Sequence, residues 1–253
     1  MMHLWNPWEI YDRLIEDIDP HVSVQSAAIE GKWCRVTTSE GGAGMAFHMP
    51  VESMPRGLEE PLEGRALRDV AACAKSWNFV EAGMGMAAIN AWYALPERAE
   101  ANGFTPCAQN NWQNLFDPWA ERSAGARVAV IGHFPFAAAA LPNVSELLIL
   151  ERIVQPGDYP DSACEYVLPT CDYVFISGSA FVNKTMPRLL ELSKDATTIV
   201  VGPSTPAAPL LLEYGVDHLT TFSTQQASLL EQALGGQLMG GMYEAGRRIE
   251  LSA

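Results

Sequence analysis

After residue 127 the sequence alternates short apolar runs with segments of helical character, and this alternation limits the fold more than any other feature. The apolar runs are RVAVIGHF at 127–134, ELLILE at 146–151, DYVFIS at 172–177, TTIVV at 197–201 and a shorter run at 217–222. Helices are predicted between and after them, at 161–168, 182–194, 206–214 and 224–234. Near-continuous apolar strands that helices cover on both faces are typical of a parallel sheet. We therefore predict an α/β domain with a parallel sheet in the C-terminal half.

The first 120 residues have a different pattern, in which strands come before helices. The predicted elements are an amphipathic helix, three strands and two helices, in that order, at 7–18, 22–30, 32–38, 44–49, 65–76 and 79–95. Such an order indicates a small α+β unit. Pro, Gly, Ser and charged residues gather at 117–127, and this composition is typical of a linker. We therefore predict two domains, at residues 1–120 and 121–253.

Charge and composition narrow the classes of partner. The chain has 253 residues with 16 basic and 30 acidic side chains, a formal net charge of -14. Such a charge repels phosphate backbones and anionic lipids, so we expect neither nucleic acid nor membrane as a partner. No apolar stretch reaches the roughly 18 residues of a membrane span, and no basic start precedes an apolar stretch, so we expect a cytoplasmic protein. The five cysteines form no C-x-x-C pair, which argues against a disulfide framework or a zinc knuckle.

Polar residues and glycines follow the predicted strands. In an open parallel sheet, ligands bind outside the carboxyl ends of the strands, so these positions are the candidate ligand contacts: Gly132, His133, Glu151, Ser177, Gly178, Ser179, Asn183, Thr185, Ser204 and Thr205. Asp158 lies in the turn PGDYPD at 156–161 and joins them as a ligand contact. Asn90 lies among apolar residues of a predicted helix that also contains glycines, which close packing would explain. We expect Asn90 to be buried and hydrogen-bonded at the interface between the domains, and we include it among the candidate ligand contacts.

The first two strand ends share one feature with dinucleotide-binding units. Glu151 follows Gly132 by 19 residues, close to the spacing of an acidic residue that binds ribose hydroxyls. However, Gly132 stands alone, and the residues after it, His133-Phe134-Pro135, replace the glycine-rich G-x-G-x-x-G pattern. A pyrophosphate at this turn is therefore disfavoured. His133 is the histidine best placed for acid–base work or metal ligation, and an ordinary hydrogen-bonded histidine is the alternative.

Two turns before predicted helices carry small hydroxyl residues, at 177–185 and 202–206. The free N–H groups of a helix N-terminus can bind a carboxylate or a phosphate. Simple capping by Ser179 or Asn183 explains the same residues equally well. Both interpretations stay open at this point.

Six segments of the chain are distinctive when they are taken together in their order along the sequence. They are AAINA around Asn90, VIGHFP at 130–135, LILE ending at Glu151, PGDYPD at 156–161, CDYVFISGSAFVNKT at 171–185 and GPSTPAAP at 202–209. Together they resemble an uncharacterised prokaryotic family described as "putative heavy-metal chelation domain", in which an enolase-N-terminal-like domain precedes a Rossmann-like domain. The resemblance implies an active site in a cleft between the two domains. It also implies a role in metal homeostasis, through making or modifying a chelating small molecule.

The residues themselves supply no metal-binding motif, because the chain has no H-x-x-x-H, no C-x-x-C and no compact His/Cys cluster. The leading hypothesis is therefore a small polar or metal-chelating ligand bound between the domains, with a divalent or heavy metal, free or chelated, as the candidate cofactor. Two alternatives are an enzyme that uses a nucleoside cofactor such as S-adenosylmethionine or NAD, with Glu151 on the ribose, and a non-catalytic ligand sensor or subunit. Whether the protein is an enzyme, and whether it forms a homo-oligomer, stay open.

Overall fold

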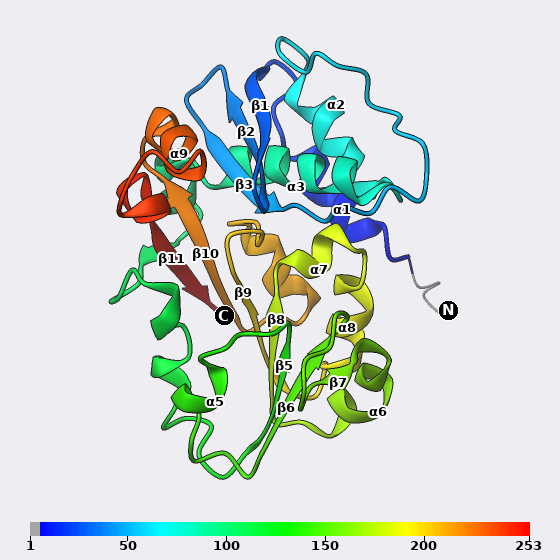
Figure 1. Cartoon of the computed structure of the whole chain (residues 1–253), viewed down its shortest axis with the longest axis vertical. Helices are drawn as coiled ribbons and strands as arrows, with labels where there is room; N and C mark the ends of the chain where they lie inside the picture. Colours follow the sequence, from blue (N-terminus) through cyan, green and yellow to red (C-terminus); the bar gives the residue numbers. More distant parts are fainter. Residues whose placement is uncertain (1–5) are drawn as a thin grey trace.

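A computed structural model describes residues 6–253 of the chain. A three-stranded antiparallel sheet and an eight-stranded, mostly parallel sheet form its two parts (Figure 1). This arrangement confirms the predicted fold class, a small α+β unit followed by a parallel-sheet unit. None of the helices in the described residues combines the length and the apolar character that a membrane crossing requires.

The N-terminal unit contains the elements that the sequence predicts, with slightly shorter bounds. Its antiparallel sheet pairs neighbouring strands in chain order, β1 (Val24–Glu30), β2 (Trp33–Thr38) and β3 (Ala43–Phe47). Its helices are α1 (Glu9–Glu16), α2 (Leu67–Ala72), α3 (Phe79–Tyr93) and α4 (Pro96–Ala101). Nearly every residue of α3 is buried, so this helix forms the centre of the unit.

Helix α3 touches the backbone of its neighbours, and two glycines make this possible. A Cβ on Gly44 of β3 would lie 2.1 Å from the backbone nitrogen of Ala91 in α3. A Cβ on Gly85 of α3 would lie 2.1 Å from the backbone nitrogen of Ala74, in the 3-10 turn Cys73–Lys75 that follows α2. The predicted reason for glycine in this helix, a close approach of another backbone, is confirmed.

The large sheet has the strand order β4-β11-β10-β9-β8-β5-β6-β7. Six strands run parallel, namely β5 (Arg127–Ile131), β6 (Glu146–Glu151), β7 (Tyr159–Pro160), β8 (Tyr173–Ser177), β9 (Thr197–Val201) and β10 (His218–Thr224). Beyond β10 the sheet continues with β11 (Gly246–Ser252), which pairs antiparallel with β10, and β4 (Thr105–Pro106), which pairs antiparallel with β11. The five predicted strands are confirmed. The strand β11 and the two-residue strands β4 and β7 were not predicted from the sequence.

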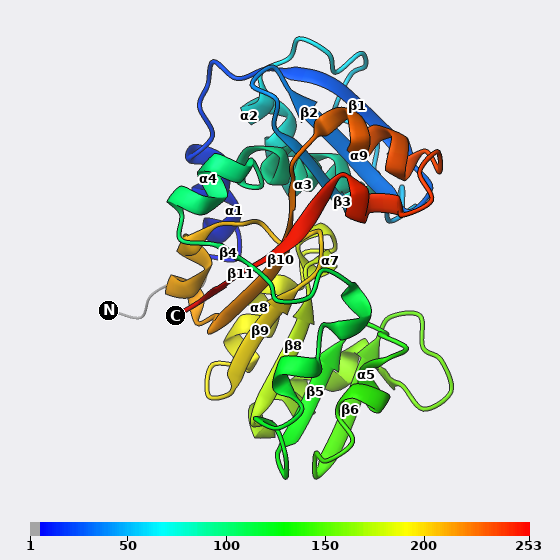
Figure 2. The same cartoon turned by 90° about the vertical axis from the view of Figure 1, so that its left-hand side faces the viewer.

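Both faces of the parallel strands are buried, as predicted. Alternate residues of β5 and β8 enter two different apolar clusters, for example Ala129 and Val174 in one, Val128 and Phe175 in the other. Helices α6 (Cys164–Val167), α7 (Ser179–Val182) and α8 (Met186–Leu192) belong to the first cluster. Helix α5 (Ala137–Ala140) and the 3-10 turns Trp112–Asn114 and Asp117–Trp119 belong to the second (Figure 2).

Some predicted helices have a different form. The segment predicted as one helix at 182–194 is two helices, α7 and α8, separated by Lys184 in a left-handed conformation with φ 69°. The segment at 206–214 forms a 3-10 helix at Pro209–Tyr214, and only the middle of 161–168 is α-helical. Pro187 and Pro209, at the starts of α8 and of the 3-10 helix, have no backbone N–H group, so a longer helix cannot run through them without losing a hydrogen bond. Helix α9 (Ala227–Leu234) lies where it was predicted.

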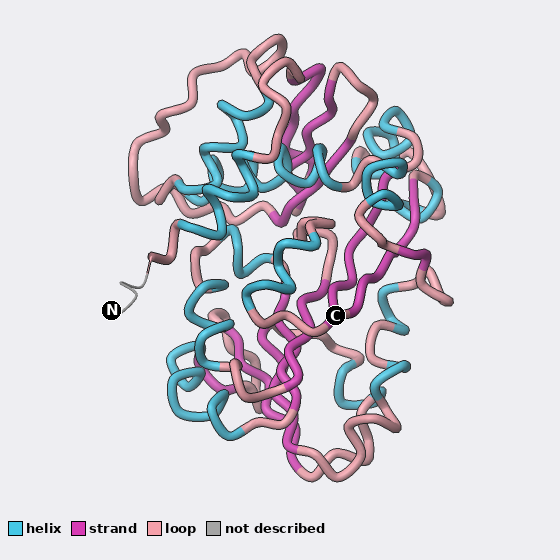
Figure 3. Tube along the Cα trace, turned by 180° about the vertical axis from the view of Figure 1, so that it is seen from behind, coloured by secondary structure: helices cyan, strands magenta, loops and turns pink. Residues whose placement is uncertain are grey.

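The last strands of the large sheet connect it to the N-terminal unit. Ala43 and Met45 of β3 share an apolar cluster with Phe222 of β10 and Leu230 of α9. Figure 3 shows the same arrangement from behind, with the strands of the large sheet ending below the N-terminal unit. The N-terminal unit thus covers the carboxyl ends of the central strands, which decides where a ligand can approach them. The exact domain division at residue 120 stays a prediction.

Candidate ligand site at the strand ends

Three adjacent parallel strands, β9, β8 and β5, end side by side. A Cβ on Gly132, after β5, would lie 3.2 Å from the Cβ of Ser177, the last residue of β8. A Cβ on Gly178 would lie 2.4 Å from Oγ1 of Thr205 and 2.5 Å from its backbone nitrogen, in the turn after β9. The structure therefore brings these four predicted residues together. We call the three turns and the residues that contact them the strand-end site.

Asn90 joins the strand-end site to the N-terminal unit. Its Nδ2 donates to the carbonyl of Met45 in β3 at 2.8 Å and to that of Pro203, in the turn after β9, at 3.2 Å. The side chain is 2% exposed. The neighbouring Ser204 accepts a hydrogen bond at 2.8 Å from the backbone N–H of Phe47. The predicted burial, hydrogen bonding and interface position of Asn90 are therefore confirmed.

Two buried polar atoms at this junction have no hydrogen-bond partner in residues 6–253. They are Oδ1 of Asn90 and Oγ1 of Thr205, a residue that is 1% exposed. Leaving such atoms unpaired costs about 1–3 kcal/mol each. Both atoms belong to residues selected from the sequence as candidate ligand contacts, and both can hydrogen-bond to a polar molecule.

His133 and Asp158 form the chemically most capable pair at this edge of the sheet. The Nδ1 of His133 lies 3.1 and 3.0 Å from the two carboxylate oxygens of Asp158. The Asp158 side chain is 3% exposed and also accepts a hydrogen bond at 2.9 Å from the backbone N–H of Gln155. A carboxylate beside Nδ1 keeps the proton on that nitrogen, so Nε2 of a neutral ring is the acceptor. His133 can therefore take a proton from a ligand, or bind a metal carried by one, through Nε2.

Glu151 stabilises the turn that carries His133. One of its carboxylate oxygens accepts the backbone N–H of His133 at 2.9 Å. The other accepts the N–H groups of Arg152 at 2.6 Å and Ile153 at 3.3 Å. These bonds connect the ends of β5 and β6 and fix the position of His133. Binding of a ribose by Glu151 stays a prediction.

The hydroxyl residues after β8 mostly hydrogen-bond to one another. Oγ of Ser177 lies 2.9 Å from Oγ of Ser179. Oδ1 of Asn183 accepts from the backbone N–H of Thr185 at 3.1 Å and from its hydroxyl at 2.6 Å. The latter is a local turn closed by an Asn side chain, which agrees with the capping interpretation for Asn183. Direct ligand contacts by these four residues stay predictions.

Lys184 was not among the residues predicted from the sequence. Its Nζ donates to the carbonyl of Val182 at 2.7 Å and lies 5.3 Å from the ring centroid of Phe79, the first residue of α3. Burial lowers the pKa of its ammonium to about 7. Its position between Asn183 and Thr185 is visible in the sequence, but its burial against the N-terminal unit depends on the tertiary fold.

A resident metal ion needs several ligand side chains grouped around one point. Among residues 6–253, no group of three or more His, Cys, Asp or Glu side chains is arranged to hold one. Heavy metals prefer thiolate ligands, yet burial raises the pKa of the thiols, to about 11 for Cys73 and about 12 for Cys34, Cys107 and Cys164. These thiols stay protonated at neutral pH. The residues present therefore do not fit a resident metal held by the protein alone.

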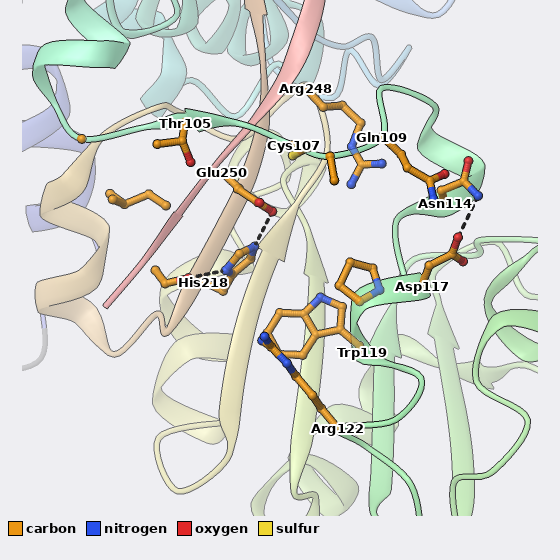
Figure 4. A pocket seen from close by; sticks show the side chains of 15 residues that line it. Thr105, Cys107, Gln109, Asn114, Asp117, Trp119, Arg122, His218, Arg248 and Glu250 are labelled. Atoms are coloured by element: carbon orange, nitrogen blue, oxygen red, sulfur yellow. Dashed lines mark hydrogen bonds and ion pairs between the residues drawn. The ribbon is translucent and has the colours of Figure 1, made fainter.

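Two cavities lie away from the strand-end site, and none of the twelve predicted residues lines either. The larger has a volume of about 700 Å³ and lies between the segment from Gly103 to Arg122 and the strands β10 and β11 (Figure 4). The smaller, about 360 Å³, lies between α1 and the 3-10 helix at Pro209–Tyr214. The sequence gives no sign of either cavity, because their walls come from segments that are distant in the chain.

The fold and the strand-end site define a class of protein: a two-part α/β protein whose polar side chains gather where the parallel strands end, the edge that binds ligands in such sheets. Comparisons with known proteins make this specific. The chain belongs to the family DUF364, described as "Putative heavy-metal chelation", whose sequence model matches residues 114–250. A second family model with the same description, DUF4213, matches residues 11–93. The family resemblance predicted from the sequence is confirmed.

Individual relatives agree with this assignment. A crystal structure of a DUF364 protein of unknown function from Desulfitobacterium hafniense is 36% identical, with a TM-score of 0.87 over 97% of this chain and 98% of that one. Another, from Pyrococcus horikoshii, is 21% identical, with a TM-score of 0.76 over 98% and 99% of the two chains, and shows the fold alone. An uncharacterised protein of Methanocaldococcus jannaschii is 26% identical over 186 residues, which are 70% of this chain and 68% of that protein.

Proposed function

We propose that this protein binds a small polar or metal-chelating organic molecule at the strand-end site, between the N-terminal unit and the large sheet. The observation that carries the proposal is the His133–Asp158 pair, with Nδ1 of His133 3.0 Å from Oδ2 of the almost fully buried Asp158. A buried carboxylate that orients a histidine is a common arrangement in acid–base and metal-binding sites. The family description agrees with a ligand of this chemistry.

In this proposal a metal is cargo that enters already bound to an organic chelator. The protein would supply the Nε2 of His133 to the metal or to the chelator, and Asn90 and Thr205 would hydrogen-bond to the polar groups of the chelator. This assignment uses the two buried atoms that lack partners in residues 6–253. It also agrees with the protonated thiols, which are poor ligands for a free metal ion.

Calorimetry tests the proposal with Zn²⁺ and Ni²⁺, each free and as its citrate and histidine complexes. We expect a chelate to bind more tightly than the free ion, and His133→Ala to weaken that binding at least tenfold, about 1.4 kcal/mol. Asp158→Asn should weaken it less, because the ring keeps its side chain but loses its orienting charge. His21→Ala is the matched control, because His21 is exposed and belongs to the N-terminal unit. Absence of binding by every probe, or equal loss in His21→Ala, would refute the proposal.

The nucleoside-cofactor alternative has less support, because both oxygens of Glu151 already accept backbone N–H groups. A thermal-shift screen with S-adenosylmethionine and NAD tests it, since a ligand at 100 times its Kd stabilises the fold by about 2.7 kcal/mol. The sensor hypothesis predicts binding of the chelate without turnover. The enolase-like and Rossmann-like names of the two parts, a cytoplasmic location and self-association remain proposals of the same kind.

A further inference from the structure

The 700 Å³ cavity lies beside β10 and β11, and none of the twelve candidate residues lines it. His218, the first residue of β10, lines one end of it, and Arg248, which pairs with Phe222, lines it nearer to the carboxyl end of β10. The other walls are the carboxyl half of β11 and the segment from Gly103 to Arg122 (Figure 4). Its volume lies within the range of small-molecule sites, about 300–1,000 Å³. Nothing in the proposed function uses this cavity.

Arg248 of β11 is the feature that gives this cavity a binding preference. The residue is 3% exposed, and Figure 4 shows its guanidinium pointing into the cavity. Nη1 donates to the carbonyl of Asn111 at 2.6 Å, and the ring of Trp112 lies 4.9 Å away, while Nε has no partner in the described residues. Burial lowers the pKa of Arg248, yet arginine stays charged at neutral pH.

A buried guanidinium is costly unless an anion pairs with it. No carboxylate of residues 6–253 lies within the 4.0 Å of an ion pair with Arg248. A bound carboxylate would accept its N–H groups, and the planar fork of arginine matches the two oxygens of such a group. Arg248 therefore favours a ligand with a carboxylate at this end.

Two carboxylates also line the cavity, Glu250 on the same strand as Arg248 and Asp117 on the segment from Gly103 to Arg122. Glu250 lines the cavity and places Oε2 3.5 Å from Nε2 of His218. Asp117 also lines it and accepts a hydrogen bond at 2.7 Å from Asn114. Burial lowers the pKa of His218, so this histidine is neutral at neutral pH and does not offset these two charges. The exposed Arg122, 5.2 Å over the ring of Trp119, is the other cation of the lining.

We propose that this cavity is a binding site for a small amino-carboxylate, a molecule of the amino-acid type. Its carboxylate would pair with Arg248, its ammonium group would face Glu250 and Asp117, and its side chain would lie against Trp119. The two carboxylates of the lining disfavour polyanions such as diphosphates, and the uncompensated guanidinium disfavours simple amines. The net charge of the chain, -14, acts in the same direction against polyanions.

The test begins with a thermal-shift screen of the standard amino acids on the full chain, followed by calorimetry on the one with the largest shift. Its analogues without the amino group and without the carboxylate are then measured, with inorganic phosphate and pyrophosphate alongside. We expect both analogues to bind at least tenfold more weakly than the amino acid, and the phosphates not to compete. No bound amino acid, or tighter binding of a phosphate, overturns the proposal.

Variants locate the binding in the cavity. Arg248→Met should weaken amino-acid binding at least tenfold. Arg248→Lys keeps the positive charge and should restore part of the affinity, which would show that the loss does not come from a folding defect. Glu250→Gln should weaken binding of the amino acid while leaving its analogue without the amino group unchanged. Arg247→Gln is the matched control, because Arg247 is the exposed neighbour on the same strand and successive side chains point to opposite faces. Equal effects of the Arg247 and Arg248 substitutions overturn the proposal.

A chemical footprint gives an independent readout. Cys107 lines the cavity, and Cys73 lies in the N-terminal unit with an intermediate exposure like that of Cys107. The bound amino acid should slow alkylation of Cys107 by N-ethylmaleimide several-fold and leave Cys73 unchanged, as read by mass spectrometry. Unchanged alkylation of Cys107 at a saturating ligand concentration overturns the assignment to this cavity. The substitutions of His133 and Asp158 at the strand-end site should not alter this protection, so the two proposals fail separately.

Discussion

Arg35 of β2 and Glu231 of α9 form an ion pair, with Nη2 and Oε1 3.1 Å apart, that joins the N-terminal unit to the last helix of the chain. The two ends of this pair differ in environment, because the Arg35 side chain is 2% exposed and that of Glu231 is 55% exposed. Arg35 also donates to Glu30 at 3.2 Å and to Ser26 at 2.8 Å. The guanidinium thus connects three segments, while Glu231 supplies one solvated contact.

We predict that substitutions at the two ends of this pair lower the free energy of unfolding by different amounts. Arg35→Met should lower the free energy of unfolding by about 2 to 3 kcal/mol, because it removes several charge-assisted hydrogen bonds at a buried position. Glu231→Gln should lower it by about 0.5 kcal/mol or less, as for other solvent-exposed ion pairs. Urea unfolding measures both. Equal losses would show that the exposed contact contributes as much as the buried ones.

Gly178→Ala should damage the strand-end site. The new Cβ would lie 2.5 Å from the backbone nitrogen of Thr205, so the turns after β8 and β9 must separate, at a cost of about 1–3 kcal/mol. The matched control is Gly57→Ala, because a Cβ there meets no atom within 4 Å and the backbone φ is not in the left-handed region. We expect the melting temperature and the affinity for the chelate to fall in Gly178→Ala and to stay unchanged in Gly57→Ala. Unchanged stability and binding in Gly178→Ala would contradict the prediction and would mean that the two turns move apart easily.

The buried ammonium of Lys184 should make the stability of the protein depend on pH. Burial lowers the pKa of its ammonium from 10.5 to about 7, so between these pH values the unfolded chain binds more protons than the folded one. The contribution of Lys184 to the free energy of unfolding should therefore rise from pH 7 to 10.5, and the penalty of burying the charge is complete below pH 7. Lys184→Met removes this penalty, so its advantage over the wild type should be largest at or below pH 7 and shrink as the pH rises.

Urea unfolding at several pH values measures the effect of Lys184. Lys194→Met is the control, since Lys194 is exposed, and it should follow the wild type across the whole range. A constant difference between Lys184→Met and the wild type from pH 7 to 10 would contradict the prediction.

The two histidines that face carboxylates should carry their protons on different nitrogens. Nδ1 of His133 lies 3.0 Å from Asp158, so a neutral ring is protonated at Nδ1. His218 has Nε2 beside Glu250 and accepts at Nδ1 from the hydroxyl of Ser252 at 2.8 Å, so it is protonated at Nε2. Long-range ¹H–¹⁵N NMR distinguishes the two tautomers. Asp158→Ala should change the pattern of His133 alone, and the same tautomer in both rings would contradict the geometry.

Much of the fold can be predicted from the sequence because its strands have strong patterns. The strands β5, β6, β8, β9 and β10 are continuous apolar runs, which a sheet buried on both faces requires. The strand β11 was missed because its sequence, GRRIELS, contains charged residues at both faces. One of them, Arg248, is buried next to a cavity that only the tertiary fold creates. A pattern of apolar residues cannot reveal a strand whose buried face carries charge.

The candidate site was predictable in position but less so in detail. The rule that ligands bind at the carboxyl ends of parallel strands correctly brought Gly132, Ser177, Gly178 and Thr205 together. The burial of Asn90 followed from its apolar neighbours. The pairing of His133 with Asp158 was not predicted, since it depends on the path of a long loop after β6. Lys184 was overlooked because neither its left-handed backbone nor its burial leaves a mark in the local sequence.

The place of β11 in the large sheet has a consequence for how the chain is made. β11, at residues 246–252, pairs on one side with β10 and on the other with β4, at residues 105–106. On the ribosome, β4 is therefore synthesised some 140 residues before its only strand partner in the described chain. The parallel core can assemble earlier, but the wall that carries Arg248 and Glu250 closes only after release of the last residues of this strand from the exit tunnel.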